Sequence, residues 1–323
     1  MANRGKKTKR IEFIIGLIIL ILIAILSESG IIPIEEVFNS ENSEVLDSNE
    51  ISKRVTAEES ENVTLEGEDI LQIHFFDVGQ ADSTLIISDN KTMLIDAGTN
   101  EMGSKVVANI KKLGIEKIDY LIGTHPHEDH IGGLDDVIKN FEIGTIYMPK
   151  IQTNTKTFED VLDAITEKNL TITTPKEGDK FEIGKAECEI MLCGTGTKEE
   201  KENLNLSSIV TKVTYGKQSY LFMGDSEKEN EQSRTWPKVN VLKVGHHGSN
   251  TSSSKEFLNQ VLPQIAIISV GKDNSYGHPK QVILDRLNKI GAVIYTTKDK
   301  GNILIESDGN NNKVSFYILG NLS

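Results

Sequence analysis

The sequence predicts an α/β domain of layered sheets covered by helices, which we place in residues 70–323 of the 323-residue chain. Two observations predict this class. From residue 70 onward, short runs rich in β-branched and aromatic residues alternate with amphipathic segments of helical spacing, and turn residues separate them. The first 69 residues differ in composition and lack this alternation. Because sheets and helices must each bury an apolar face, many strands with helices between them predict packed layers.

The expected elements follow in chain order. Strands are expected at residues 70–76, 84–87, 92–95, 118–122, 145–148, 170–173, 180–183, 188–192, 209–215, 219–223, 239–244, 265–270, 293–296, 303–306 and 314–318. Helices are expected at residues 103–113, 134–141, 158–168, 255–262 and 279–289. The two cysteines, Cys188 and Cys193, are expected to be buried free thiols, because residues five apart on a strand point to opposite faces.

Residues 1–30 predict a membrane anchor. Five basic residues precede an apolar run from Ile11 to Leu26, which with its flanks reaches the roughly 20 residues that a spanning helix needs. The basic residues predict that this end stays in the cytoplasm, so that the rest of the chain lies outside the cell. The expected location is therefore the cell membrane, with a single pass. A cleaved signal, giving a secreted protein, and a buried core helix are the alternatives.

Residues 31–69 predict a flexible acidic linker. They hold twelve Asp or Glu against Lys53 and Arg54, and Phe38 is their one aromatic residue. Such a segment cannot bury enough apolar surface to offset its ordering entropy. Most of the net charge of −13 lies here, so the domain itself is only mildly acidic. This charge allows an anionic substrate but argues against strong non-specific duplex binding, which requires a basic face.

Six of the seven histidines fall in three places, each beside glycine. The first is the run His-Pro-His-Glu-Asp-His at residues 125–130, the second is His246-His247, and the third is His278. The first two directly follow apolar strands, where functional side chains often collect on a rigid scaffold. Imidazole nitrogens and carboxylate oxygens suit zinc and related ions. We therefore interpret the run as metal ligands rather than as a solvated polar loop.

The spacing within the run predicts two neighbouring ions. His125 and His127 lie on the same side of an extended loop and can reach one ion, whereas Asp129 and His130 turn toward a second. Asp225 ends an apolar strand and could bridge both ions, although Gly-Asp after a strand is often only a turn. Two such ions can activate water and stabilise opposite sides of a displacement.

The remaining polar candidates have simpler expectations. Two adjacent histidines cannot easily face one ion, so the pair His246 and His247 is expected to supply one ligand and one group for substrate contact or proton transfer. Glu128, between ligands, is expected to face solvent. His74, on the first strand, and Lys243, on a short apolar strand, are expected to be structural.

Several motifs resemble the metallo-β-lactamase-fold hydrolases, and in particular the hydrolase domain of ComEC-type competence proteins. The general resemblance lies in the run at 125–130 followed by Gly132-Gly133. The subtype is indicated by FDVGQADS at 76–83, LIDAG at 94–98, THPH at 124–127, LKVGHHGS at 242–249 and YGHP at 276–279. The resemblance runs from about Ile70 to the C-terminus. It does not include the multi-spanning channel of those proteins, so a stand-alone relative on one anchor is expected.

The resemblance implies a four-layer αββα sandwich with two divalent ions, zinc or alternatively manganese, between the sheet edges. The ligands that it implies are His125 and His127 for the first ion, Asp129 and His130 for the second, Asp225 as the bridge, and His247, or alternatively His246, completing the second. Asp96 resembles the aspartate that orients the histidine loop from behind. The loop at 77–83 is expected to form part of the pocket rim. The expected substrate contacts are Asp77, Gln80, Asp82, Asn205 and Ser249.

One departure from the family concerns the first ion. Many members have a further histidine before the bridging aspartate, but none occurs here between His130 and His246. Asn203 or Asn205 lies where ComEC-type relatives are rich in asparagine, and His278 could serve from another loop. We therefore expect the first ion to be held more weakly.

The expected function is hydrolysis by metal-activated water, with Asp129 and either His246 or His278 as the catalytic groups. A phosphodiester is the favoured substrate. The resemblance suggests single-stranded DNA, and similarity at the histidine motifs extends to extracellular phosphorylcholine esterases acting on cell-wall polymers. The alternatives are a carboxylic ester or lactone, a β-lactam, and a non-catalytic surface binding module with a structural metal site. Beyond the membrane, no obligate protein partner is indicated.

Overall fold

The computed structural model describes residue 65 and residues 69–317 of the chain. The expected anchor at 1–30 and nearly all of the expected linker at 31–69 lie outside the described residues. Within the described part of the chain, none of the helices has both the length and the apolar character needed to cross a bilayer.

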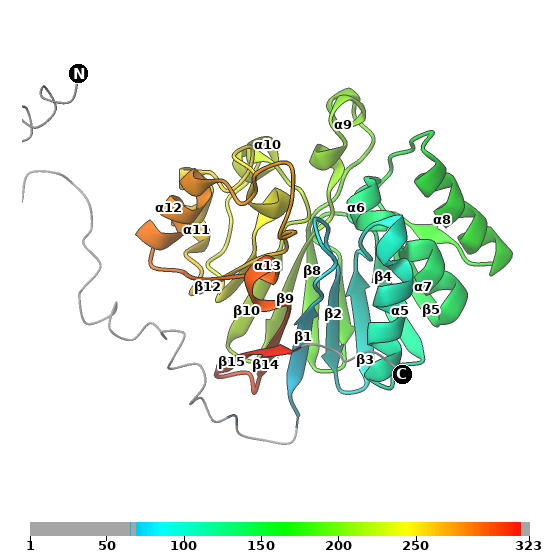
Figure 1. The fold of residues 1–323 in the computed structure, drawn as a ribbon, viewed down its shortest axis with the longest axis horizontal. Helices are drawn as coiled ribbons and strands as arrows, with labels where there is room; N and C mark the ends of the chain where they lie inside the picture. Colours follow the sequence, from blue (N-terminus) through cyan, green and yellow to red (C-terminus); the bar gives the residue numbers. More distant parts are fainter. Residues whose placement is uncertain (1–64, 66–68, 318–323) are drawn as a thin grey trace, which may run out of the picture. The chain divides into compact units, whose positions relative to one another are not determined.

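Two β-sheets form the centre of the described domain (Figure 1). The first sheet contains, in spatial order, β15 (Asn312–Tyr317), β14 (Asn302–Ser307), β1 (Leu71–Phe75), β2 (Thr84–Ser88), β3 (Lys91–Ile95), β4 (Lys117–Ile122), β5 (Glu142–Tyr147) and β6 (Ile172–Thr173). The second contains β13 (Val293–Thr296), β12 (Ile265–Ile268), β11 (Val241–Lys243), β10 (Gln218–Phe222), β9 (Val210–Tyr215), β8 (Ala186–Leu192) and β7 (Lys180–Ile183). The strands β3 to β6 are parallel, and so are β10 to β13.

Helices cover the outer face of each sheet (Figure 1). On the first sheet these are α5 (Gly103–Lys112), α7 (Leu134–Asn140) and α8 (Lys156–Glu167). On the second they are α11 (Lys255–Val261) and α12 (Gln281–Lys289). The order of layers is therefore helix, sheet, sheet, helix, as the resemblance implied.

Three hydrophobic cores hold the four layers together. Along β2 and β3, Ile86 and Met93 face the core between the sheets, whereas Leu85 and Leu94 face the core beneath the helices. This alternation follows from the two-residue period of a strand whose two faces are both buried. Between the sheets, Phe75 stacks on Phe222 with ring centroids 6.2 Å apart. Burying an aromatic side chain of this size contributes about 1.5–3 kcal/mol.

Every strand and helix expected from residue 70 onward is present, with ends shifted by up to three residues. Among the described residues, four short α-helices were not expected: α6 (Glu128–Ile131), α9 (Lys198–Glu202), α10 (Lys228–Gln232) and α13 (Thr297–Lys300). Three short 3-10 helices were not expected either: Asn100–Met102, Leu204–Ser207 and Gly245–Gly248. They are too short for an apolar period to show. Cys188 and Cys193 are free thiols in the structure; Cys188 is buried as expected, whereas Cys193 is only partly buried.

The topology brings distant loops to one edge of the sandwich. Parallel strands place their carboxyl ends at the same edge, which is where α/β folds collect functional groups. Asp96 directly follows β3, and the run at 125–130 follows β4. In the second sheet, Asp225 follows β10 and the histidine pair follows β11. Figure 1 shows α6, α9 and α10 at this same end of the domain.

Candidate metal centre

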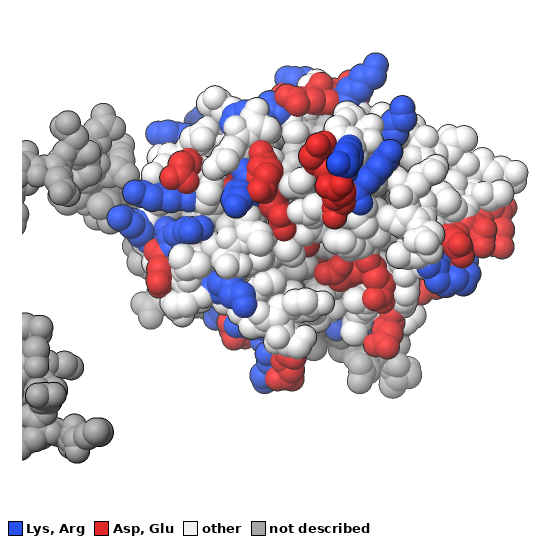
Figure 2. Space-filling model, turned by 90° about the horizontal axis from the view of Figure 1, so that it is seen from above, with Lys and Arg blue, Asp and Glu red and all other residues white. Residues whose placement is uncertain are grey.

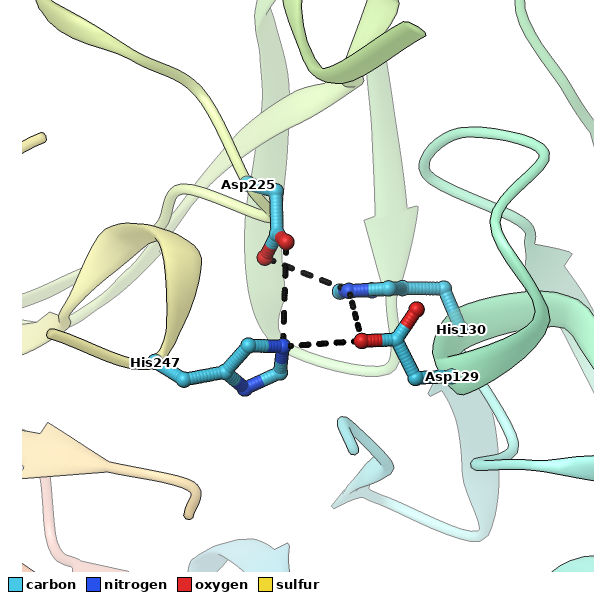
Figure 3. Close-up of side chains that lie close together, drawn as sticks. All are labelled: Asp129, His130, Asp225 and His247. Atoms are coloured by element: carbon cyan, nitrogen blue, oxygen red, sulfur yellow. Dashed lines mark hydrogen bonds and ion pairs between the residues drawn. The ribbon is translucent and has the colours of Figure 1, made fainter. Parts of the chain in front are cut away.

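Four side chains from three separate loops converge at this edge (Figure 3). Asp129, His130, Asp225 and His247 each offer a ligand atom, and these atoms lie within 4.8 Å of one another. Nε2 of His130 is 3.2 Å from Oδ1 of Asp225. Nε2 of His247 is 3.3 Å from Oδ2 of Asp129 and 3.7 Å from Oδ2 of Asp225. The arrangement gives two imidazole nitrogens and two carboxylates around one point.

Hydrogen bonds behind the cluster fix the orientation of both imidazoles. Nδ1 of His130 is 2.8 Å from Oδ2 of Asp96, which also accepts from the hydroxyl of Thr124. Nδ1 of His247 is 2.9 Å from the carbonyl oxygen of Ser269. Because a carbonyl oxygen only accepts, Nδ1 of His247 carries hydrogen and Nε2 faces the carboxylates. Such outer partners set the tautomer in metal-binding histidines.

The cluster is strongly polarised. Burial would lower the pKa of His247, but Asp225 and Asp82 raise that pKa to about 10. Burial would likewise lower the pKa of His130, but Asp225 and Asp96 raise it well above its usual value. In return, burial would raise the pKa of Asp225, which His130 and His247 hold well below its usual value. Buried carboxylates that remain ionised attract a cation, and a divalent ion can replace the imidazole protons.

The residues present fit a divalent ion. Nε2 of His130 and Oδ1 of Asp225 are buried and lie 3.2 Å apart, but they are not aligned for a hydrogen bond with each other or with any other group. Buried polar atoms normally have a hydrogen-bond partner, so each such exception needs an explanation. Metal coordination is a direct one, since nitrogen and oxygen donors suit zinc and manganese.

The histidines expected for the first ion lie beside this cluster. Nε2 of His125 is 3.0 Å from Nδ1 of His127. Burial lowers the pKa of both imidazoles, so both are neutral near pH 7 and able to bind a metal. Among the described residues, however, no group of three or more candidate ligands within 4.8 Å of one another includes either histidine. Their assignment to a first ion stays a prediction.

A second group of close potential ligands lies behind the cluster, comprising Asp82, Asp96 and His130. Nζ of the buried Lys243 donates to Oδ2 of Asp82 over 2.7 Å, and Asp96 accepts from Thr124. Oδ1 of Asp82 also lies 3.3 Å from Nδ1 of His247. These carboxylates already have cationic or hydrogen-bonding partners, and they support the two imidazoles from behind.

A cleft of about 330 Å³ opens onto the cluster. Its lining residues are Gln80, His127, Glu128, Asp129, Asp225, His246, His247, Tyr276 and His278. Nε2 of His246 lies 3.7 Å from Oδ2 of Asp225, and its Nδ1 is 3.2 Å from Oε1 of Glu227. Glu227 in turn accepts from the side-chain amides of Asn203 and Asn205, over 2.9 and 3.1 Å. His246 therefore lines the cleft, and its Nδ1 is held in place by Glu227.

The histidine pair sits in an unusual backbone turn. His246 and His247 have φ of 49° and 51°, in the left-handed region that non-glycine residues rarely adopt. Such residues cost of order 1–3 kcal/mol each and cluster at functional sites. The turn directs two successive side chains to different partners: His247 is 2% exposed and joins the cluster, whereas His246 contacts Glu227 and Thr251.

The expected substrate contacts separate into two groups. Gln80 lines the cleft. The other four lie outside the lining residues, namely Asp77, Asp82, Asn205 and Ser249. Asp82, Asn205 and Ser249 are buried. A direct contact of these four residues with a substrate stays a prediction.

The structural expectations for two other residues are confirmed. His74 is buried, with Nδ1 2.8 Å from the hydroxyl oxygen of Tyr317. Lys243 is buried and donates to Asp82 and to the carbonyl oxygen of Val244. Glu128 is exposed, as expected, and also lines the cleft.

Two residues of the site were missed by sequence reasoning. Glu227 gives no signal in the sequence beyond its position two residues after Asp225. Tyr276 belongs to the YGHP motif, in which only His278 was predicted to be functional. Its ring stacks on His278 with centroids 5.7 Å apart, and burial together with the nearby His246 lowers the pKa of His278 to about 4.

Comparison with known proteins agrees with this geometry. Residues 76–272 match the family described as the metallo-beta-lactamase superfamily. The chain is 32% identical over 254 residues to ComE operon protein 3 of Bacillus subtilis, covering 72% of this chain and 32% of that protein. It is 30% identical over 241 residues to Recombination protein 2 of Haemophilus influenzae, covering 72% of this chain and 28% of that protein. The chain thus spans about a third of the length of these relatives.

A third relative, Competence protein ComA of Neisseria gonorrhoeae, is 30% identical over 234 residues, covering 70% of this chain and 31% of that protein. Among solved structures, the metallo-beta-lactamase fold protein YhfI from Bacillus subtilis superposes with a TM-score of 0.51 at 11% identity, over 74% of this chain and all of that one. At this identity the superposition shows the fold alone. With the family match and the competence-protein relatives together, the chain belongs to the metallo-beta-lactamase superfamily and carries a domain of the ComEC type.

Proposed function

We propose that this protein is a metal-dependent phosphodiester hydrolase that acts outside the membrane. The observation that carries the proposal is the convergence of Asp129, His130, Asp225 and His247 within 4.8 Å at the base of a polar cleft. Two of the relatives are named as a recombination protein and a competence protein, and recombination acts on DNA, which supports a phosphodiester over a carboxylic ester.

The cluster residues would hold one divalent ion, and His125 and His127, sharing Asp225, would hold a weaker second. Zinc is the favoured metal and manganese the alternative. When bound, such ions supply Lewis acidity that lowers the pKa of water toward neutrality and neutralises charge on a departing oxygen. The protein's own part is to keep Nε2 of His130 and of His247 aimed inward, through Asp96 and Ser269.

His246 is the best-placed residue for proton transfer to the leaving oxygen. Its Nε2 faces the cleft beside Asp225, and its Nδ1 is held between Glu227 and the hydroxyl of Thr251, 2.9 Å away. A group that donates a proton must be held within hydrogen-bond reach of the reacting atom. A phosphodiester bound at the cluster would lie beside Nε2 of His246, which is 3.7 Å from Oδ2 of Asp225.

The charge of the surrounding face supports a substrate held at a few points. Figure 2 shows this end of the domain from above, with basic and acidic side chains interspersed and no continuous basic strip. A duplex tracked along its backbone requires such a strip. A substrate held at only one or two phosphates does not.

The test of the proposed hydrolase is cleavage of bis(p-nitrophenyl) phosphate by the full-length chain in detergent, with Zn²⁺ or Mn²⁺. Substituting a residue that only hydrogen-bonds to a metal ligand typically lowers activity roughly 10- to 100-fold. Asp225→Asn changes a proposed ligand and should lose more activity than this. His74→Gln, a buried change outside the cleft, is the control and should retain activity. Full activity in Asp225→Asn would contradict the proposed site.

The same preparation separates the rival functions. Turnover of p-nitrophenyl acetate or a lactone without turnover of the diester would indicate an ester or lactone hydrolase. Metal binding without turnover of any ester would indicate a binding module. For the location, protease added to intact cells should digest the domain, and the chain should sediment with membranes; a domain protected in intact cells would contradict it.

A further inference from the structure

We propose that Tyr276 is a stacking platform for an unpaired nucleobase next to the scissile phosphodiester, so that the cleft takes single-stranded nucleic acid. The proposal rests on the proposed function, because it positions the base relative to a phosphodiester held at the cluster. It adds a specificity-determining residue that touches the substrate but takes no part in the chemistry.

The exposure of Tyr276 is the first observation. Its side chain is 65% exposed, against 41% for Val282 and 40% for Phe316, the other large hydrophobic residues exposed in the described chain. Tyr276 also lines the cleft that contains Asp129 and Asp225. An aromatic residue left mostly in solvent at the mouth of a polar cleft contributes little buried surface to the fold, which indicates a binding role.

The ring of Tyr276 also ends a row of three aromatic rings that leads to the cluster of Asp129, His130, Asp225 and His247. Tyr276 stacks on His278, with ring centroids 5.7 Å apart and planes inclined by 21°. His278 meets His246 edge to face, with centroids 5.9 Å apart. His246 reaches to within 3.7 Å of Asp225. Two ring-to-ring steps therefore separate the cluster-facing histidine from the exposed ring, so a phosphate at the cluster and its neighbouring base could be held together.

The backbone that carries Tyr276 is held in place although the ring is exposed. The side chain of Asn274 donates to the carbonyl oxygens of Gly271 and His278 and accepts from the amide of His278, over 2.8 to 2.9 Å. Nζ of Lys280 donates to the carbonyl oxygen of Tyr276 over 2.5 Å, which also brings a positive charge to the rim. A preorganised platform loses little conformational entropy when a ligand binds.

The composition of the cleft favours a nucleobase over a choline group. Quaternary ammonium groups are recognised by cages of several aromatic faces. Tyr276 is the only Phe, Tyr or Trp that lines the cleft within the described residues. A nucleobase needs only one aromatic face, and stacking of this kind is tolerant of sequence. Bases within a duplex are already stacked on one another and would not reach the ring.

The test is fluorescence anisotropy with the full-length chain in detergent. The probes are a fluorescein-labelled oligothymidylate with phosphorothioate linkages, which suppress hydrolysis, and the same oligomer without bases. We expect Tyr276→Ala to weaken binding of the oligothymidylate roughly 5- to 150-fold. Binding of the baseless oligomer should change less than about twofold, and Tyr276→Phe should bind like the unaltered protein because its ring is kept.

Phe316→Ala is the matched control, because it removes another exposed ring, on β15, that does not line the cleft. It should leave both affinities unchanged. The platform is wrong if Tyr276→Ala binds oligothymidylate normally, or weakens both oligomers equally. A choline site would give a different result: phosphorylcholine would bind the unaltered protein but not Tyr276→Ala, and Tyr276→Ala would still bind oligothymidylate normally. That result would also overturn the platform.

These outcomes are separable from those of the hydrolase assay. Diester hydrolysis with equal binding of both oligomers would remove the platform and leave the proposed function standing. Base-dependent binding without any diester hydrolysis would contradict the proposed hydrolase and leave the base-binding role of Tyr276 standing.

Discussion

Oδ2 of Asp96 lies 2.8 Å from Nδ1 of His130, and both side chains are almost completely buried. Asp96 also accepts from the backbone amide and the hydroxyl of Thr124. The aspartate therefore ties the start of the histidine run to its last imidazole. Asp96 directly follows β3 and has a φ of 59°, in the left-handed region.

Replacing Asp96 by Asn should weaken metal binding, because an amide is a poorer acceptor for Nδ1–H and would not fix the ring of His130 in the same way. We expect metal affinity to fall by about 10- to 100-fold. Titration with Zn²⁺ followed by isothermal calorimetry measures the loss. Asp135→Asn, at an exposed ion pair on α7, is the control. Unchanged affinity in Asp96→Asn would show that the hydrogen bond does not support the centre.

The cluster and the His125–His127 pair should differ in affinity for metal. His130→Ala removes a residue of the close group and should abolish the tighter binding step. His125→Ala should remove only the weaker step, because no close group of potential ligands contains it within the described residues. Metal content after dialysis, measured by plasma mass spectrometry, distinguishes the two. Equal loss in both variants would indicate a single cooperative dinuclear centre.

Glu227 should act by positioning His246. Glu227→Ala removes the carboxylate 3.2 Å from Nδ1 of His246, and we expect kcat to fall about 10- to 100-fold while KM and metal content change little. Glu227→Gln keeps a hydrogen-bonding oxygen and should recover part of the loss. Glu229→Gln, on the exposed face of α10, is the matched control. A fall in metal content with Glu227→Ala would instead make the effect structural.

The buried pair of Lys243 and Asp82 should show a large penalty when only one partner is removed. Lys243→Met leaves Asp82 without its cation, 3.3 Å from His247, and loss of one partner of a buried pair costs roughly 3–5 kcal/mol. Adding Asp82→Asn should restore part of this stability. Urea unfolding of the single and double variants provides the cycle. Additive losses would show that the two residues are not coupled.

His74 should make the fold sensitive to acid. Burial lowers its pKa from 6.5 to about 4, so between these values the unfolded chain binds a proton that the folded chain does not. The contribution of neutral His74 is therefore complete above about pH 6.5 and is lost as the pH falls toward 4, by ~3 kcal/mol in total. His74→Gln has no such group. The difference in unfolding free energy between the two proteins should thus shift in favour of the variant on acidification, and a constant difference would contradict the assignment.

The fold could be predicted to this extent because its strands carry local signals. Apolar runs such as 118–122 end abruptly at polar residues, and this marks both the strand and the edge where ligands gather. The placement of Asp225 beside His130 follows once those two strand ends are assigned to one edge. The short helix α6 could not be predicted, because its four residues are too few to show an apolar period and two of them, Asp129 and His130, are candidate ligands.

Other parts of the site depend on contacts between distant residues. Asp82 was expected on the pocket rim, but it pairs with Lys243, 161 positions away, and is buried. Glu227 matters only because the turn after β11 brings His246 against it. No local pattern encodes such pairings, so sequence reasoning named the correct loops more reliably than the role of each residue within them.

The left-handed turn has opposite effects at His246: its backbone conformation costs stability, and it directs an imidazole to the cleft. Glycine adopts this conformation without strain, so His246→Gly should relieve local backbone strain while it removes the imidazole from the cleft. Selection for a more robust fold alone would therefore tend to replace this histidine. A histidine in this strained conformation is what a chain under selection for chemistry at this point would show.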